Sequence, residues 1–136
     1  AVGDGAIGQA RLRRAHPQVL ASLRTMSHYF LAVHSDTERP PMSAERQEQA
    51  WADTGDFNQR MREQGALVYA NGIASDSLVI DARGEHVAES AGPFADGPRR
   101  IAGFWILDAP DAETARAWAI EASAACNEPV ELRAFL

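Results

Sequence analysis

Histidine side chains can exchange a proton near neutral pH, and His34 has the best position in this sequence for such chemistry. It ends an apolar stretch that we expect to be a central strand, and loops gather at strand ends. The neighbouring Ser35 and Asp36 could orient its imidazole for proton transfer. The alternative is a solvated histidine at the end of a strand, with no catalytic role.

The spacing of the histidines argues against a metal site. No two of them have the close spacing of paired zinc ligands on one helix. His28 and His34 share a strand face but lie ~20 Å apart at roughly 3.3 Å per residue, so they cannot share an ion within one chain. We therefore predict no metal ion. The histidines are at positions 16, 28, 34 and 86.

A second group of candidates surrounds the turn formed by Gly92-Pro93-Phe94. Asp96, Arg99 and Arg100 flank this turn, and they could bind an anionic ligand through charge-assisted hydrogen bonds or simply be a solvated loop. Asp96 could also act with His34 as an acid–base pair. The candidate catalytic residues are His34 and Asp96, and the candidate ligand-binding residues are Tyr29, His34, Phe94, Asp96 and Arg99.

Two stretches that are apolar on both faces are expected to position these side chains. In residues 28–34, one face carries Tyr29, Leu31 and Val33, and the other carries His28, Phe30, Ala32 and His34. In residues 101–107, one face carries Ile101, Gly103, Trp105 and Leu107, and the other carries Ala102, Phe104 and Ile106. This pattern is typical of strands that are covered on both sides.

Two helices are predicted between the strands. The first follows Ser43 as its N-cap, runs for about 20 residues, and ends where Gly65 offers a left-handed C-terminal cap. The second begins at about Asp111 and carries an apolar stripe. We expect the three tryptophans to be core or interface anchors and Cys126 to be a buried, inert thiol.

The remaining predicted elements complete an α+β fold. A short strand at Leu67–Ala70 is closed by Asn71-Gly72, and a last strand covers Val130–Leu136. Leu78–Asp81 and His86–Glu89 form a hairpin of modest apolar content, which we expect to be an edge element. Without it the order is βαββαβ, so we predict a ferredoxin-like fold with an inserted β-hairpin. The two strands that are central in this fold are the two that are apolar on both faces.

Composition limits the class of protein. The 136 residues suit one domain, and 46% hydrophobic with 24% charged residues is ordinary for a globular protein. The formal net charge of −6 argues against a nucleic-acid partner. No apolar run approaches the roughly 20 residues of a membrane span, and the single cysteine suits a reducing compartment. Because a secretory signal is also lacking, we expect a cytoplasmic protein with no membrane partner.

Residues 1–25 differ from the rest of the chain. They contain three glycines and four arginines but one acid, Asp4. One interpretation is a basic arm for nucleic acid. We favour an N-terminal extension, flexible or forming a short helix, that is dispensable for folding, with the domain proper at residues 26–136. The glycines do not follow a predicted strand, so a phosphate-binding loop is unsupported and no cofactor is expected.

Several elements of residues 26–136 together resemble the YCII-related proteins, in particular their DGPF subgroup. They are Gly92-Pro93-Phe94, Gly103-Phe104, Trp118 and Val130-Glu131-Leu132-Arg133, in that order. The sequence departs from the subgroup at Ala91, where the motif has aspartate, and its first helix lacks the histidine of relatives with proposed catalysis. The resemblance implies a dimeric ferredoxin-like α/β barrel, and it carries over no active site. Some members are associated with alternative sigma factors, which hints at regulation.

Two functions follow as hypotheses. The first is a small cytosolic homodimer that binds a small molecule or a regulatory protein partner. Its subunits would appose their sheets, because two helices cover one face of a sheet and leave apolar side chains on the other. The second is a lyase- or isomerase-type enzyme that uses His34 and a nearby carboxylate as acid and base. A second titratable group facing His34 inside a closed pocket would favour the enzyme.

Overall fold

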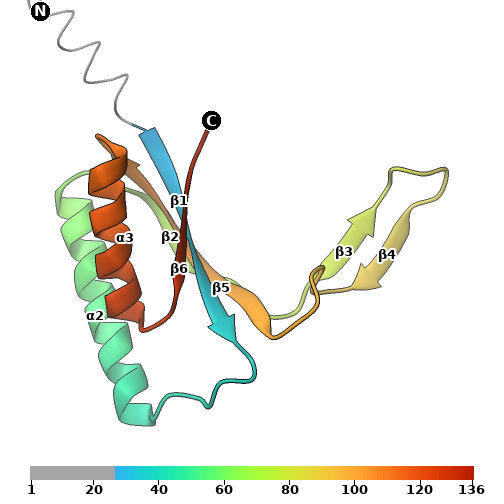
Figure 1. Cartoon of the computed structure of the whole chain (residues 1–136), viewed down its shortest axis with the longest axis horizontal. Coiled ribbons are helices and arrows are strands. Elements are labelled where there is room, and N and C mark those ends of the chain that lie inside the picture. Colours follow the sequence, from blue (N-terminus) through green and yellow to red (C-terminus); the bar gives the residue numbers. More distant parts are fainter. Residues whose placement is uncertain (1–26) are drawn as a thin grey trace, which may run out of the picture.

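A computed structural model describes residues 27–136 of the chain (Figure 1). The predictions for residues 1–25 and for the start of the domain at Met26 lie outside these residues. The elements are β1 (Ser27–Asp36), α2 (Ala44–Glu63), β2 (Leu67–Gly72), β3 (Leu78–Asp81), β4 (Ala88–Ala91), β5 (Arg99–Ala109), α3 (Ala112–Cys126) and β6 (Val130–Ala134). None of the helices in this part of the chain is both long and apolar enough to span a membrane.

A four-stranded sheet in the order β2-β5-β1-β6 forms the body of the molecule, and all of its neighbouring strands pair antiparallel. Figure 1 shows α2 and α3 side by side on one face of this sheet. The fold is therefore α+β and is compatible with the predicted ferredoxin-like arrangement. β1 and β5 are central, as their doubly apolar pattern predicted. We call the face that carries no helix within residues 27–136 the open face.

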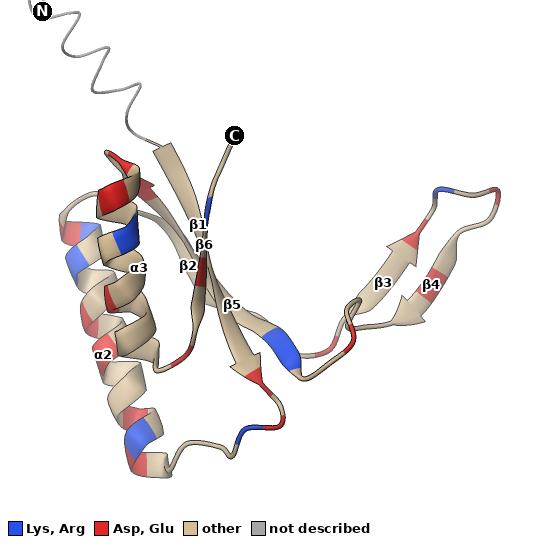
Figure 2. Cartoon of the chain, viewed as in Figure 1, with Lys and Arg blue, Asp and Glu red and all other residues tan. Residues whose placement is uncertain are grey.

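Local capping determines both helices, as predicted. The side chain of Ser43 accepts a hydrogen bond from the backbone N–H of Arg46 at the start of α2, and Gly65 follows its end at φ +69°. Asp111 caps α3 by accepting a bond from the N–H of Thr114, which lowers the pKa of the Asp111 carboxyl. In Figure 2 the charged residues of α2 lie along its length, as expected for a helix with one solvated side.

The core lies between the sheet and the two helices. Leu31 of β1 and Leu107 of β5 are fully buried, as are Phe57 and Met61 of α2. The rings of Phe57 and Trp105 meet edge to face with their centroids 5.5 Å apart. The tryptophan prediction is correct for the buried Trp105 and for Trp118, which packs against the core while half-buried. It is wrong for Trp51 as a core residue of this chain, because 69% of Trp51 is exposed.

A register shift between β1 and β5 moves Ile101 to the face opposite the predicted one. Val33 pairs with Gly103, but the next residue, His34, pairs with Ile101, so Ala102 is left out of the pairing. One extra residue reverses the alternation of side chains along the strand. Ile101 therefore lies beside His34 on the open face and is 45% exposed, rather than sharing a face with Trp105.

Four other strand predictions need correction. β2 continues through Asn71-Gly72, which pairs with β5 instead of closing the strand. The second arm of the hairpin is Ala88–Ala91, two residues later than predicted, because the turn closed by the Asp81–Arg83 contacts is longer. The hairpin is a separate two-stranded sheet and not an edge of the main one; Figure 1 shows it projecting from the body. β6 ends at Ala134.

Candidate functional site

His34 lies on the open face beside a carboxylate that the sequence did not single out. Its Nε2 atom is 3.0 Å from Oε1 of Glu131 on the adjacent strand β6, and its backbone N–H donates to the carbonyl of Pro129. Glu131 also accepts hydrogen bonds from Arg133. The hydrogen bond from His34, and then the bonds and charge of Arg133, lower the pKa of the Glu131 carboxyl. The pair is partly solvated, since the Glu131 side chain is 44% exposed.

The other sequence candidates are distributed over different surfaces. Tyr29 is buried in the core on the helix-covered side of β1, so it cannot share a cavity with His34. Arg99 pairs in register with Asp36, which places it on the same face as His34, further along the strands. Asp96 lies in the exposed loop before β5, and Phe94 is 87% exposed in the same loop. The carboxylate bonded to His34 is therefore Glu131 and not Asp96.

The Gly92-Pro93-Phe94 turn has a structural role at the base of the hairpin. The N–H of Gly92 donates to the carbonyl of Ser77, which closes the β3–β4 pair. A Cβ atom at Gly92 would overlap the Ser77 hydroxyl and come within 3.1 Å of the Ser77 Cβ atom, so a side chain there would displace the side chain of Ser77. The glycine of the motif thus has a packing role, and this contact assigns it no chemistry.

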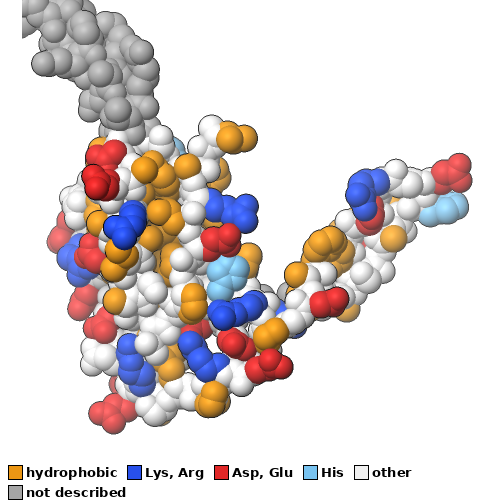
Figure 3. All heavy atoms as spheres, viewed as in Figure 1, with side chains coloured by type: hydrophobic (Ala, Val, Ile, Leu, Met, Phe, Trp, Pro, Cys, Tyr) orange, Lys and Arg blue, Asp and Glu red, His pale blue; other side chains and the backbone are white. Residues whose placement is uncertain are grey.

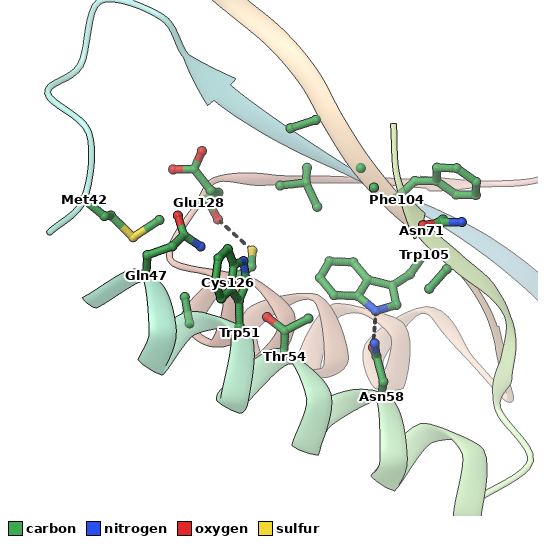
Figure 4. A pocket seen from close by; sticks show the side chains of 16 residues that line it. Met42, Gln47, Trp51, Thr54, Asn58, Asn71, Phe104, Trp105, Cys126 and Glu128 are labelled. Carbon is green, nitrogen blue, oxygen red and sulfur yellow. Dashed lines mark hydrogen bonds between the residues drawn. The ribbon is translucent and has the colours of Figure 1, made fainter. Parts of the chain in front are cut away.

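A cavity of about 480 Å³ lies on the other side of the sheet, between α2 and strands β2 and β5 (Figure 4). We call it the α2 cavity. Its helix side is formed by Gln47, Ala50, Trp51, Thr54 and Asn58, and its sheet side includes Asn71, Gly72, Gly103, Phe104 and Trp105. Within the size range of ligand pockets, it combines apolar walls with a few polar groups. None of the sequence candidates lines it.

Paired glycines form the floor of the α2 cavity. Gly72 and Gly103 face each other in the β2–β5 register, so neither strand places a side chain at this point. Glycine is favoured at position 103 because a Cβ atom there would come within 3.0 Å of the carbonyl oxygen of Asn71 and 3.3 Å of the Gly72 Cα atom. The floor is consequently bare backbone beneath the side chains of α2.

One polar contact fixes the orientation of an aromatic wall. The indole N–H of Trp105 donates to Oδ1 of Asn58 at 2.6 Å, from the sheet to the helix (Figure 4). Trp105 is buried, so this bond satisfies a donor that would otherwise be costly and holds the ring in one position. Trp51, about two turns before Asn58 on α2, is by contrast exposed at the mouth of the cavity.

The α2 cavity is lined by two ionisable side chains, Glu128 and Cys126. Glu128 forms an ion pair with Arg39 and has little exposed surface. Cys126 is half-buried, and burial raises the pKa of its thiol, which favours the protonated form. This agrees with the prediction of an inert thiol, although the residue is only partly covered. In residues 27–136, no cluster of three His, Cys, Asp or Glu side chains could hold a metal ion.

The open face carries a cluster of aromatic side chains. Phe30 stacks on Phe104 at 5.6 Å between ring centroids and meets Phe135 edge to face at 6.3 Å, while Tyr69 lies 5.8 Å from Phe104. The three phenylalanines and Ile106 also line a shallow, largely apolar groove at the end of β6. We call this set of residues the open-face cluster. Phe104 lies at the border between this cluster and the α2 cavity on the other side.

Comparison with known proteins identifies one family. The family model for the YCII-related domain matches residues 10–134 of the chain. No curated protein matches it. The match covers most of the sequence, including every strand and helix described above and part of the N-terminal segment.

Proposed function

This chain belongs to the YCII-related family, and we propose that it is a homodimer that binds a small organic molecule in the α2 cavity. The observation that carries the proposal is the cavity itself. Its volume, its aromatic walls and its few amide and hydroxyl groups are those of a site for an organic ligand. We further assign the chain to the DGPF subgroup, on the motif that ends the β3–β4 hairpin.

The chemistry of the lining favours binding over catalysis at this cavity. Proton transfer needs a group whose pKa lies near the working pH. Burial raises the pKa of the Cys126 thiol, which favours its protonated form, and the Glu128 carboxylate is already paired with Arg39. Asn58 is bonded to Trp105 and acts as a positioning group.

The open-face cluster supports the homodimer. Several large aromatic side chains lie on a face that no other element of residues 27–136 covers, and soluble monomers seldom expose such a patch. Apposing the same face of a second copy would cover both patches with twofold symmetry. An obligate pair of this kind is expected to bury about 1,500 Å² or more in total. The result would be the dimeric α/β barrel that the sequence resemblance implies.

The cavity proposal can be tested by filling the cavity. Thr54 lies on the α2 side of it and is half-buried, so Thr54→Phe should occupy the space while keeping the helix. Gln59→Phe, on the exposed side of the same helix, is the matched control. We expect fragments that raise the melting temperature of the wild-type chain to lose this effect in Thr54→Phe and retain it in Gln59→Phe. Fragments that stabilise all three proteins equally would contradict the proposal.

A second candidate function rests on the 3.0 Å contact between His34 and Glu131. An imidazole held by a carboxylate is a suitable acid–base pair for a lyase or isomerase. A second copy placed on the open face would enclose this pair, which is partly solvated in the single chain. The test is exchange of carbon-bound protons into D₂O, followed by NMR over a panel of 2-oxo acids and lactones. Exchange that persists unchanged in His34→Ala would remove the enzyme hypothesis.

We propose a cytoplasmic location, which is supported by a single cysteine that cannot form a disulfide within the chain. A regulatory protein partner is the alternative to a small-molecule ligand. The exposed hairpin is the surface that would best suit such a partner. Loss of binding to that partner on removal of the hairpin, with ligand binding intact, would separate the two.

A further inference from the structure

The side chains that line the α2 cavity carry no net positive charge. In the described part of the chain, no Lys, Arg or His lines it, and Glu128 is its one carboxylate. Arg39 lies next to this carboxylate but is already engaged in the ion pair with it. An anionic ligand would therefore have to leave water without a counter-charge, or displace Glu128 from Arg39. Both are costly in a cavity with largely apolar walls.

The polar groups of the cavity are of the kind that suits uncharged ligands. Gln47 carries an amide and Thr54 carries a hydroxyl, so each can both donate and accept a hydrogen bond. Asn58 also lines the cavity; its carbonyl oxygen accepts from Trp105 (Figure 4), and its NH₂ group is a further donor. Such groups can form hydrogen bonds with an amide or a ring nitrogen, and no charged group has to be buried.

The shape of the cavity suits a flat molecule. The Gly72–Gly103 floor presents peptide planes without side chains, and the indole of Trp105 is held in one orientation by Asn58. Trp51 stands at the mouth, where 69% of it is exposed to water. Closing this indole over a bound ring would bury apolar surface of both. Planar rings gain most from such a floor and wall.

From these three features we propose that the α2 cavity takes an uncharged planar molecule, an aromatic or heteroaromatic ring with an amide-like substituent, and rejects its carboxylate analogue. The inference rests on the proposed function, because it names the class of ligand for the same cavity. It predicts a selectivity that the cavity's existence alone would not require.

The experiment uses three probes that share one ring: 2-naphthamide, 2-naphthoate and 2-naphthylmethylammonium. Each is titrated into the full chain at pH 7 and followed by calorimetry. We expect the amide to bind at least ten-fold more tightly than the carboxylate and the ammonium. Glu128→Gln should raise the affinity for the carboxylate about ten-fold and leave that for the amide unchanged, because it removes one negative charge and releases Arg39. Arg39→Gln is the matched variant and should weaken the carboxylate further.

The outcomes separate the ligand class from the site. If 2-naphthoate or the ammonium binds as tightly as the amide, and this binding is lost in Thr54→Phe, the proposal of an uncharged ligand is overturned while the α2 cavity remains a binding site. If none of the three probes binds, or if binding persists in Thr54→Phe, the proposed function fails and this inference fails with it. If 2-naphthamide binds, loses its binding in Thr54→Phe and keeps its affinity in Glu128→Gln, the result supports both the α2 cavity as the site and the uncharged class of ligand.

Discussion

The four-stranded sheet and the β3–β4 hairpin carry similar alternating apolar residues, but they differ in what covers them. Leu31 and Leu107 of the sheet are fully buried beneath two helices. Leu78 and Ile80 of the hairpin are 58% and 62% exposed, and Figure 3 shows hydrophobic side chains on its surface. An isolated two-stranded hairpin is at best marginally stable in water. Backbone pairing alone therefore does not bury apolar surface; a second layer is needed.

The open face lies between these two extremes. Its aromatic residues contact one another across β1, β5 and β2, so they are partly covered, but the face has no second layer within residues 27–136. Figure 1 shows the hairpin projecting on the side away from the helices. A second copy on the open face would thus supply the missing layer for the sheet and lie close to the hairpin.

Phe57→Ala tests the covered region and should have the largest effect. Phe57 is fully buried and packs edge to face on Trp105, so the truncation leaves a cavity in the core. We expect the free energy of unfolding to fall by about 3–5 kcal/mol, as measured by urea denaturation. Ile80→Ala in the hairpin is the control and should cost less than about 0.5 kcal/mol. Equal losses would mean that the hairpin is packed as tightly as the core in the folded assembly.

Phe104→Asp tests whether the open face acquires its second layer from another copy. The variant places a carboxylate beside Phe30 and Tyr69, where the dimer would bury it without a partner. We expect the dissociation constant of the dimer to rise at least 100-fold, which is about 2.7 kcal/mol. Light scattering over a dilution series measures it, with Ile80→Asp in the hairpin as the control. A wild-type chain that is already a monomer of 14.7 kDa at micromolar concentration would contradict the apposed-sheet dimer.

The features predicted correctly from sequence are those determined by neighbouring residues. Ser43, Gly65 and Asp111 mark the helix ends because capping depends on a few consecutive residues. The apolar periodicity of β1 and β5 likewise predicted the central strands. The family resemblance, carried by several short motifs, agreed with the family match.

The features that were missed depend on pairing between segments far apart in the chain. The shift at Val33 reversed the side of Ile101, and the β1–β6 register brought Glu131 to His34. Neither register can be predicted from the sequence of one segment alone, because each depends on how two strands pair. The α2 cavity was missed because Asn71-Gly72 was interpreted as a turn, so the opposition of Gly72 and Gly103 could not be seen. A glycine among large residues in a central strand was the available signal.

Ser43→Ala tests a local contribution within the covered region. The Ser43 hydroxyl satisfies the N–H of Arg46 at the start of α2, and alanine would leave that donor to water. We expect a loss of about 1 kcal/mol in the free energy of unfolding, measured by urea denaturation. Ser43→Asp should restore it, since a carboxylate also accepts this bond and suits the positive end of a helix. A loss equal to that of Phe57→Ala would show that the α2 start carries packing beyond its cap.

Glu131→Gln tests the polar border of the open face, and its effect should be the smallest. Hydrogen bonds from His34 and Arg133 hold the pKa of the folded Glu131 carboxyl below its ordinary value of about 4.3. A carboxyl group whose pKa is lower in the folded than in the unfolded protein stabilises the fold at pH values above the unfolded pKa. This stabilisation is lost as the pH falls through the pKa of the folded protein. The wild-type chain should therefore exceed Glu131→Gln in melting temperature at pH 7, with the difference shrinking below pH ~4. Glu89→Gln, at an exposed position of the hairpin, is the control and should show a smaller difference at pH 7.

Because Glu131 is well exposed to water and salt, the difference in melting temperature between the wild type and Glu131→Gln should also fall in 1 M NaCl. A difference that grows on acidification would mean that His34 and Arg133 do not favour the charged form of Glu131, and the acid–base pair would lose its electrostatic basis.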